Sequence, residues 1–208
     1  MHSDHQQQLL AIARDTIYCG MRSRQVNRIE LEDLPPPLLE HRGAFVTLTL
    51  HRKLRGCVGN LSDNQPLARS VADAAHNAAF RDHRFAPMAR EELDATRIEI
   101  SVLSPTRQVN VTGREDLLAQ LVPGIDGLVL RDGRHTATFL PKVWEQLPTA
   151  EEFLEQLMRK AGLPAHHWSD TLNFERYHTT TFSESELAGQ SMSGQGRRNH
   201  SRHGDKKA

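Results

Sequence analysis

The sequence predicts an α+β domain built around a central, largely antiparallel sheet that helices flank. Three observations lead to this class. Segments of alternating apolar and polar residues recur along the chain, two of them are joined by a tight-turn signal, and helical stripes interrupt the series. With 208 residues, of which 38% are hydrophobic and 25% charged, the chain is long enough and apolar enough to bury a core.

The first half of the chain alternates helix and strand. Residues 5–22 carry an apolar stripe at helical spacing, formed by Leu9, Ile12, Ala13, Ile17 and Met21. Three prolines at 35–37 separate this helix from a predicted strand over 43–51 and a shorter strand over 54–59. Pro66 then opens a helix whose buried side is small, so that another backbone can approach it closely. That side consists of Leu67, Val71, Ala74, Ala75 and Ala78.

The middle of the chain is predicted to form strands. Residues 97–103 alternate, with apolar side chains at every second position. A β-hairpin joins 128–130 to 136–140, because the Asp132-Gly133 pair between them accepts the backbone angles of a tight turn. These segments extend the predicted antiparallel sheet.

The end of the chain divides into an ordered part and a tail. Thr149 predicts the capped start of a helix that ends at Gly162, and an extended stretch covers 172–182. We therefore place the folded domain at 5–187. Residues 188–208 are rich in Gly, Ser and Gln and poor in apolar side chains, which predicts a disordered tail. The tail is basic, with Arg197, Arg198, Arg202, Lys206 and Lys207.

Composition excludes several classes of protein. Lys plus Arg and Asp plus Glu both number 26, so the chain does not bind nucleic acid or anionic lipid by bulk charge. The two cysteines, Cys19 and Cys57, are too few for a disulfide scaffold and favour a reducing compartment. The first residues do not resemble a signal peptide, and no apolar run reaches the length of a membrane span. We expect a cytoplasmic protein.

The segment Leu54-Arg55-Gly56-Cys57-Val58-Gly59 carries the strongest chemical signal. In a regular strand Arg55 and Cys57 point to the same face, and a guanidinium beside a thiol favours the reactive thiolate. Gly56 and Gly59 permit positive φ and close approach by a ligand or another backbone. The segment therefore presents either a nucleophilic Cys57 at the rim of a cleft, or a small core cysteine beside glycines that shape a bulge.

A second cluster, Asp82-His83-Arg84-Phe85, follows the alanine-rich helix. Asp82 and Arg84 are placed to pair with each other or with the Arg55 loop. Two interpretations stay open. The cluster is a rim that binds an anion or a peptide, since guanidinium forks match carboxylate and phosphate, or it is a paired loop that ends the helix.

The 12 histidines raise the question of a metal. His76 and His83 together with Cys57 would supply three zinc ligands, enough for a catalytic site with an open position. The other histidines lack ligand spacing, and surface solvation accounts for most of them. We expect no metal held by the protein, and no cofactor.

Several segments together are similar to the AMMECR domain family, also called the A component of the AmmeMemoRadiSam system. The hexapeptide LRGCVG is preceded by GAFVTL and followed by AAFRDHRF, IEISVLSP, GLVL, FLPKVW and FLEQLMRKAGL, and the resemblance spans residues 9–184. Val58 stands where the family more often has Ile. The basic tail is not part of the family pattern.

The resemblance implies a mixed fold with a central antiparallel sheet, flanking helices and a smaller lobe. It also implies two partners, a Memo-like protein and a radical SAM protein. Within the matching motifs, we expect a ligand or a partner to bind at Arg55, Gly56, Gly59, Asp82 and Arg84.

Three hypotheses of function result. In the first, the protein is a component without a redox group that acts with the Memo-like protein and the radical SAM enzyme in a modification pathway. In the second, it is an independent enzyme that uses Cys57 as a nucleophile, helped by Arg55 and Asp82. In the third, the basic tail associates with nucleic acid. The tail has no aromatic residues on which bases could stack, which is unfavourable for this hypothesis.

Overall fold

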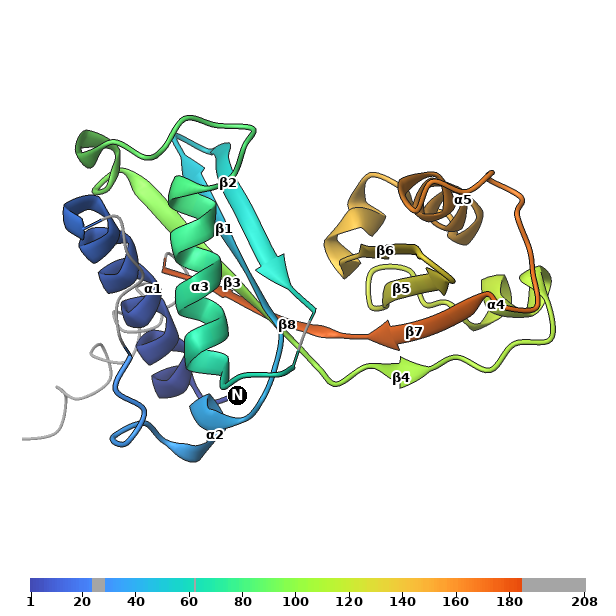
Figure 1. Ribbon diagram of the computed structural model, residues 1–208, viewed down its shortest axis with the longest axis horizontal. Helices are drawn as coiled ribbons and strands as arrows, with labels where there is room; N and C mark the ends of the chain where they lie inside the picture. The colour runs from blue at the N-terminus through green and yellow to red at the C-terminus, as the bar shows by residue number, and fades with distance from the viewer. Residues whose placement is uncertain (24–28, 62, 185–208) are drawn as a thin grey trace, which may run out of the picture.

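The computed structural model of the protein describes residues 1–23, 29–61 and 63–184. These residues form two lobes, each built on a four-stranded antiparallel sheet (Figure 1). The first lobe contains α1 (Ser3–Ser23), α2 (Pro36–Leu39), α3 (Leu67–Phe80), the 3₁₀ turn η1 (Arg90–Glu92), β1 (Ala44–Leu50), β2 (Lys53–Asn60), β3 (Thr96–Leu103) and β8 (Thr179–Ser183). The second contains β4 (Arg107–Gln108), α4 (Arg114–Gln120), β5 (Gly127–Asp132), β6 (His135–Phe139), the 3₁₀ turn η2 (Pro141–Glu145), α5 (Ala150–Lys160) and β7 (Asn173–Tyr177).

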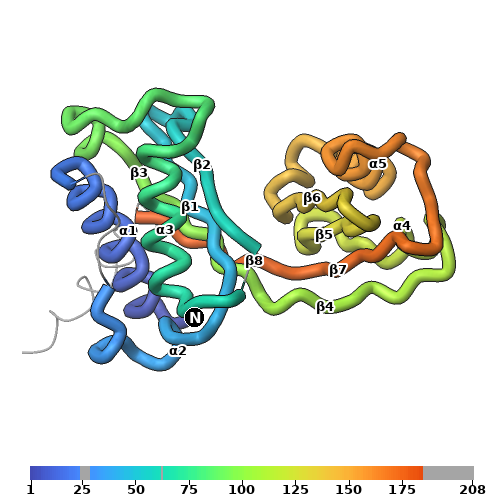
Figure 2. Tube along the Cα trace, in the orientation of Figure 1, coloured from blue at the N-terminus to red at the C-terminus, as the bar shows by residue number. Residues whose placement is uncertain are grey.

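The sheet of the first lobe has the strand order β2-β1-β3-β8, and α1 and α3 cover one of its faces (Figure 1). Inward side chains of the strands meet the apolar faces of both helices in one core, which includes Leu9, Ile17, Val46, Leu48, Val71, Ala75, Ile98 and Ile100. The opposite face of the sheet is turned toward the second lobe (Figure 2). The position of the helices therefore decides which face remains available for a ligand or a partner.

The sheet of the second lobe has the order β4-β7-β5-β6 and packs against α4 and α5. Leu117, Leu128, Phe153, Leu157 and Phe174 are among its buried residues. The indole of Trp144 in η2 stacks on the Phe153 ring, with 3.9 Å between ring centroids, and donates its N–H to the Asp126 carbonyl. This packing fixes η2 on the side of the lobe that faces β1 and β2.

The chain passes from the first lobe to the second after β3 and returns between β7 and β8 (Figure 1). Leu103, Val129 and Tyr177 form a small buried cluster at this junction. The Tyr177 hydroxyl donates to the Phe139 carbonyl at 3.0 Å, and burial raises the Tyr177 pKa to about 12. An apolar cluster with a neutral, hydrogen-bonded tyrosine thus joins the two sheets.

The predicted fold class is confirmed, and the structure adds detail to it. The extended stretch predicted over 172–182 is two strands in different sheets, since β7 pairs with β5 whereas β8 pairs with β3. The hairpin forms as predicted, with Gly133 at φ +57°, and the Thr149 hydroxyl accepts the Glu152 N–H at the start of α5. Within the described residues, no helix combines the length and apolar character that crossing a membrane requires. The predicted basic tail, 188–208, and the last residues of the predicted domain, 185–187, lie outside the described residues.

Candidate functional site

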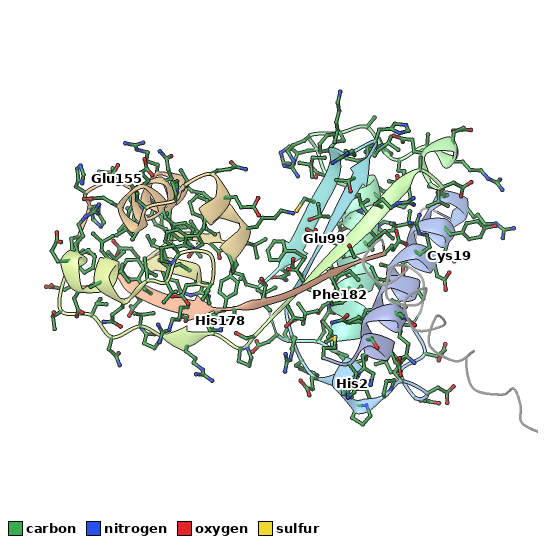
Figure 3. All side chains as sticks on the ribbon, turned by 180° about the vertical axis from the view of Figure 1, so that it is seen from behind. His2, Cys19, Glu99, Glu155, His178 and Phe182 are labelled. Carbon is green, nitrogen blue, oxygen red and sulfur yellow. The ribbon has the colours of Figure 1, made fainter. Side chains whose placement is uncertain are left out.

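Cys57 belongs to a row of polar side chains that crosses three strands of the first sheet. The register pairs Cys57 with Thr47, and Thr47 with Glu99. Because Val46 and Leu48 are buried beneath the helices, alternation turns Thr47 and its cross-strand partners to the opposite face. Figure 3 shows Glu99 on the side of the sheet that faces the second lobe. The thiol therefore lies on the face that the helices leave uncovered. In such a row, the Cβ atoms of residues directly opposite each other on neighbouring strands are about 5 Å apart.

The Thr47 hydroxyl donates to the Cys57 Sγ, with 3.4 Å between oxygen and sulfur. Cys57 is half-buried and, like Cys19 on α1, carries a free thiol. Its intermediate exposure excludes a fully buried core cysteine, because part of the side chain still reaches solvent.

The second lobe contributes a cation to the same face. Lys142 in η2 places its Nζ 2.9 Å from Glu99 Oε1. The hydrogen bond to Glu99 raises the pKa of Lys142 despite partial burial, and the negative charge of a Cys57 thiolate contributes in the same direction. Lys142 is therefore within electrostatic reach of the thiol. We refer to Cys57, Thr47, Glu99 and Lys142 together as the Cys57 row.

The backbone of Cys57 is held by a pair of charged side chains from the loop after α3. Since β2 is the outer strand of its sheet, the N–H and C=O of Cys57 have no strand partner on that side. Asp82 Oδ2 accepts the Cys57 N–H at 2.9 Å, and Arg84 Nη2 donates to the Cys57 carbonyl at 3.2 Å. Arg84 also binds Asp82 through Nε at 2.9 Å and Nη2 at 2.7 Å.

The Asp82 side chain is only 4% exposed. The hydrogen bonds from Arg84 and, secondarily, from the Cys57 N–H hold the Asp82 pKa well below its usual range, against the opposing effect of burial. The sequence left open whether Asp82 and Arg84 pair with each other or with the Arg55 loop; in the structure they pair with each other and bind the backbone of Cys57. This geometry favours the interpretation of the 82–85 cluster as a paired loop, while Arg84, which is 46% exposed, keeps one side open to solvent.

Arg55 does not lie beside the thiol, contrary to the sequence prediction. Leu54 pairs with Thr49 and Gly56 with Leu48, so Arg55 is an extra residue in β2 and forms a β-bulge. The regular alternation that would have placed Arg55 and Cys57 on one face is interrupted at this point. The cations within reach of the thiol are instead Arg84 and Lys142.

The Arg55 guanidinium binds the segment between α3 and β3. It binds both carboxylate oxygens of Glu92, at 2.7 and 2.9 Å, and the Ala86 carbonyl at 2.9 Å. The bond to Glu92 raises the Arg55 pKa and lowers that of Glu92. With 11% of its side chain exposed, Arg55 ties β2 to η1. The Phe85 ring lies 5.8 Å from the Arg55 guanidinium and 5.4 Å from that of Arg84.

Gly56 and Gly59 act through the close approach of neighbouring groups. A Cβ at Gly56 would collide with the carbonyl oxygen of Ala78 on α3, and one at Gly59 would collide with Phe45 and with the Ala44 carbonyl. Neither glycine is among the positive-φ residues of the described chain. The backbone of β2 therefore packs closely against the face of α3 that carries small side chains, as predicted. The positive φ expected at these two glycines is not found.

Sequence reasoning did not identify Thr47, Glu99, Lys142 or Glu92 as members of the site. Thr47 and Glu99 follow from the strand register once Cys57 is placed, so alternation within the two strands was the available signal. Lys142 lies within FLPKVW, but its approach to Glu99 depends on how the lobes pack. The zinc set of His76, His83 and Cys57 is not assembled: no group of three or more His, Cys, Asp or Glu in the described part of the chain is arranged to hold a metal.

The fold of two lobes, each built on a four-stranded antiparallel sheet, has a counterpart among solved structures. The crystal structure of the uncharacterized protein PH0010 from Pyrococcus horikoshii matches this chain with a TM-score of 0.80 and 31% identity, over 88% of this chain and 93% of that one. The chain belongs to the AMMECR1 family, whose model matches residues 10–182. The family resemblance noted from the sequence is thereby confirmed.

Relatives in archaea support the same family membership. Protein MJ0810 of Methanocaldococcus jannaschii is 33% identical over 171 residues, which cover 78% of this chain and 83% of the relative. A protein of Thermococcus gammatolerans is 39% identical over 172 residues, which cover 78% and 81%. These matches extend over both lobes.

Proposed function

We propose that the protein is a component that acts through the Cys57 row, together with a Memo-like protein and a radical SAM enzyme, in a modification pathway. Membership of the AMMECR1 family supports the pathway. The observation that supports this surface is the position of Cys57: its side chain lies on the uncovered face of the sheet, while Asp82 and Arg84 hold its backbone. In this proposal the row either binds a substrate or completes an active site shared with the Memo-like protein.

The charges of the row suggest how a partner would engage it. Lys142 keeps 62% of its side chain exposed while it pairs with Glu99. An exposed pair of this kind contributes at most about 1 kcal/mol to stability. It can therefore exchange its partner for an acidic group of another protein without a large cost to the fold. Arg55, which is bound by Glu92, is less suited to this role.

Native mass spectrometry of the chain mixed with the Memo-like protein tests this proposal. The informative variant is Lys142→Glu, which reverses a charge on the row. Arg134→Gln is its control, because Arg134 is exposed in the hairpin turn of the second lobe. We expect the wild type and the control to form a complex and Lys142→Glu to lose it. A complex that tolerates Lys142→Glu, or no complex with any of the three proteins, overturns the proposal.

A second candidate function is covalent chemistry by the Cys57 thiol. The observation in its favour is the hydrogen bond from the Thr47 hydroxyl to Sγ, with Arg84 and Lys142 in electrostatic reach. Donors and cations around a sulfur favour the thiolate, which is the nucleophilic form. In this function the Cys57 thiolate adds to the carbonyl carbon of a substrate, the π electrons of the C=O bond move to its oxygen, and Lys142 stabilises the negative charge on that oxygen.

The chain offers an internal control for this second function, because it contains two half-buried free thiols. Cys19→Ala leaves Cys57 as the only thiol, and Cys57→Ala leaves Cys19. We expect iodoacetamide to alkylate Cys57 several-fold faster than Cys19, and Lys142→Gln to slow the reaction of Cys57 alone. If Cys57 reacts no faster than Cys19 in the native protein, the nucleophile is excluded.

A further inference from the structure

A cavity of about 390 Å³ lies in the first lobe, away from the Cys57 row. It is formed by the last turns of α1 and α3 and by the segment that follows α3. The two helices end side by side here, since Gly20 of α1 lies against His76 and Phe80 of α3. Figure 2 shows both helices ending at the upper end of the first lobe, with α1 on the side turned away from the second lobe. The volume falls in the range of small-molecule sites, roughly 300–1,000 Å³.

One wall of the cavity contains a buried histidine without a partner. His76 is 1% exposed, and neither of its ring nitrogens has a hydrogen-bond partner among the described residues. Its ring packs against that of Phe80, with 5.1 Å between centroids. Both nitrogens are also closed to solvent, so His76 shapes the wall of the cavity without offering a polar contact to a ligand.

The remaining lining combines apolar surface with positive charge. The apolar part is supplied by Tyr18, Met21, Phe80, Pro87 and Met88. Three guanidinium groups surround it, from Arg22, Arg81 and Arg90, and the described lining includes no carboxylate. Within the described part of the chain, Arg81 and Arg90 have no ion pair, and Arg22 stands over the Tyr18 ring at 6.0 Å. Unpaired guanidinium groups around a partly apolar hollow match an anion with an apolar body.

We propose that this cavity binds a small amphipathic organic anion. The arginines hold its carboxylate or phosphate head, and the apolar body enters between Tyr18, Phe80 and Met88. The site is separate from the proposed function of the Cys57 row, because none of its lining residues belongs to that row.

Fluorescence titration with 1-anilinonaphthalene-8-sulfonate tests the charge requirement. This probe is an aromatic anion, and the neutral N-phenyl-1-naphthylamine has the same apolar body without the sulfonate. The double variant Arg81→Gln, Arg90→Gln removes two exposed guanidinium groups, and Arg134→Gln removes one from the second lobe as a control. We expect saturable binding of the anion that weakens about tenfold or more in the double variant and is unchanged in the control. The neutral probe should bind more weakly and should not respond to the double variant.

His76→Leu removes two unpaired buried nitrogens, so we expect a higher melting temperature for this variant. The exposed arginines carry the test of ligand binding. Displacement of the probe by 3-phenylpropanoate or by phenyl phosphate then distinguishes a carboxylate from a phosphate ligand. Equal affinity for the charged and neutral probes, an unaffected double variant, or displacement by neither compound overturns the proposal.

Discussion

The carboxylate of Asp82 accepts the backbone N–H of Cys57 at 2.9 Å, across 25 positions of sequence. Together with Arg84, which binds the Cys57 carbonyl, it occupies the place that another strand would take beside β2. An open strand edge invites pairing with other chains, and charged side chains are one of the ways in which proteins prevent it. The backbone of Cys57 is thereby fixed at the strand edge, while its side chain stays on the face of the sheet that the helices leave uncovered.

Replacing Asp82 should destabilise the first lobe. Asp82→Asn keeps the shape of the side chain and removes the negative charge to which Arg84 and the Cys57 N–H donate hydrogen bonds. We expect a loss of about 2 kcal/mol in the free energy of unfolding, measured with urea, because hydrogen bonds to charged groups contribute about 1.5–3 kcal/mol each. Glu91→Gln, an exposed neighbour on η1, serves as the control and should change stability by less than about 0.5 kcal/mol. An Asn variant as stable as this control would contradict the role of the pair.

The contribution of Asp82 should also depend on pH. Its pKa in the folded protein is lowered, chiefly by the hydrogen bonds of Arg84, whereas an aspartate in the unfolded chain has a pKa of about 3.9. The stabilisation is therefore complete above about pH 4 and is lost as the pH falls toward the folded-state pKa. We expect the stability gap between wild type and Asp82→Asn to narrow steadily from pH 4 to pH 2.5 in urea titrations. A gap that stays constant over this interval would argue against the assignment.

Gly56 should tolerate no side chain, because a Cβ there meets the backbone carbonyl of Ala78. Backbone cannot move aside as a flexible side chain can, so we expect Gly56→Ala to cost about 3 kcal/mol in thermal or urea unfolding. Gly113 is the matched control: its φ of 174° is extended, and nothing lies within 4 Å of a Cβ placed on it. Gly113→Ala should stay within about 1 kcal/mol of the wild type. Equal effects of the two substitutions would contradict the close approach of β2 to α3.

Thr47 should control the Cys57 thiol without controlling the fold. Thr47→Val keeps the β-branched shape and deletes the hydroxyl that donates to Sγ. We expect the alkylation rate of Cys57 by iodoacetamide, measured in the Cys19→Ala background, to fall about threefold, since a weak hydrogen bond to sulfur is lost. The midpoint of urea unfolding should be nearly unchanged. A rate that is unchanged or higher would show that the hydroxyl does not favour the thiolate.

The periodicity of the chain was sufficient to predict most elements of the fold. Apolar stripes gave α1 and α3, and alternation gave β1, β2 and β3, because these patterns follow from helix and strand geometry alone. The division of residues 172–182 between two sheets was not predictable, since it depends on which strand pairs with each half. The segment itself shows only an extended pattern.

The candidate site was predictable in its members but not in its contacts. Cys57, Asp82 and Arg84 were identified from their motifs, and the structure brings them together. The position of Arg55 was wrong because a bulge depends on register with β1, which the sequence of β2 does not reveal. Lys142 reaches the site because Trp144, in the same 3₁₀ turn, stacks on Phe153 and fixes that turn, and no local pattern encodes this approach.

The course of the chain between the lobes also determines the order in which it can fold. The first sheet needs β8 from the end of the described chain, so the whole second lobe emerges from the ribosome before that sheet is complete. Arg14 of α1 likewise gains its counterion only when Glu184 has been synthesised. The Glu184 carboxylate accepts hydrogen bonds from the Arg14 guanidinium and from the Ile98 N–H. Translation that stops before Thr179 would leave the β3 edge open and Arg14 without its counterion. Closure of the first lobe therefore requires a chain extended through Glu184.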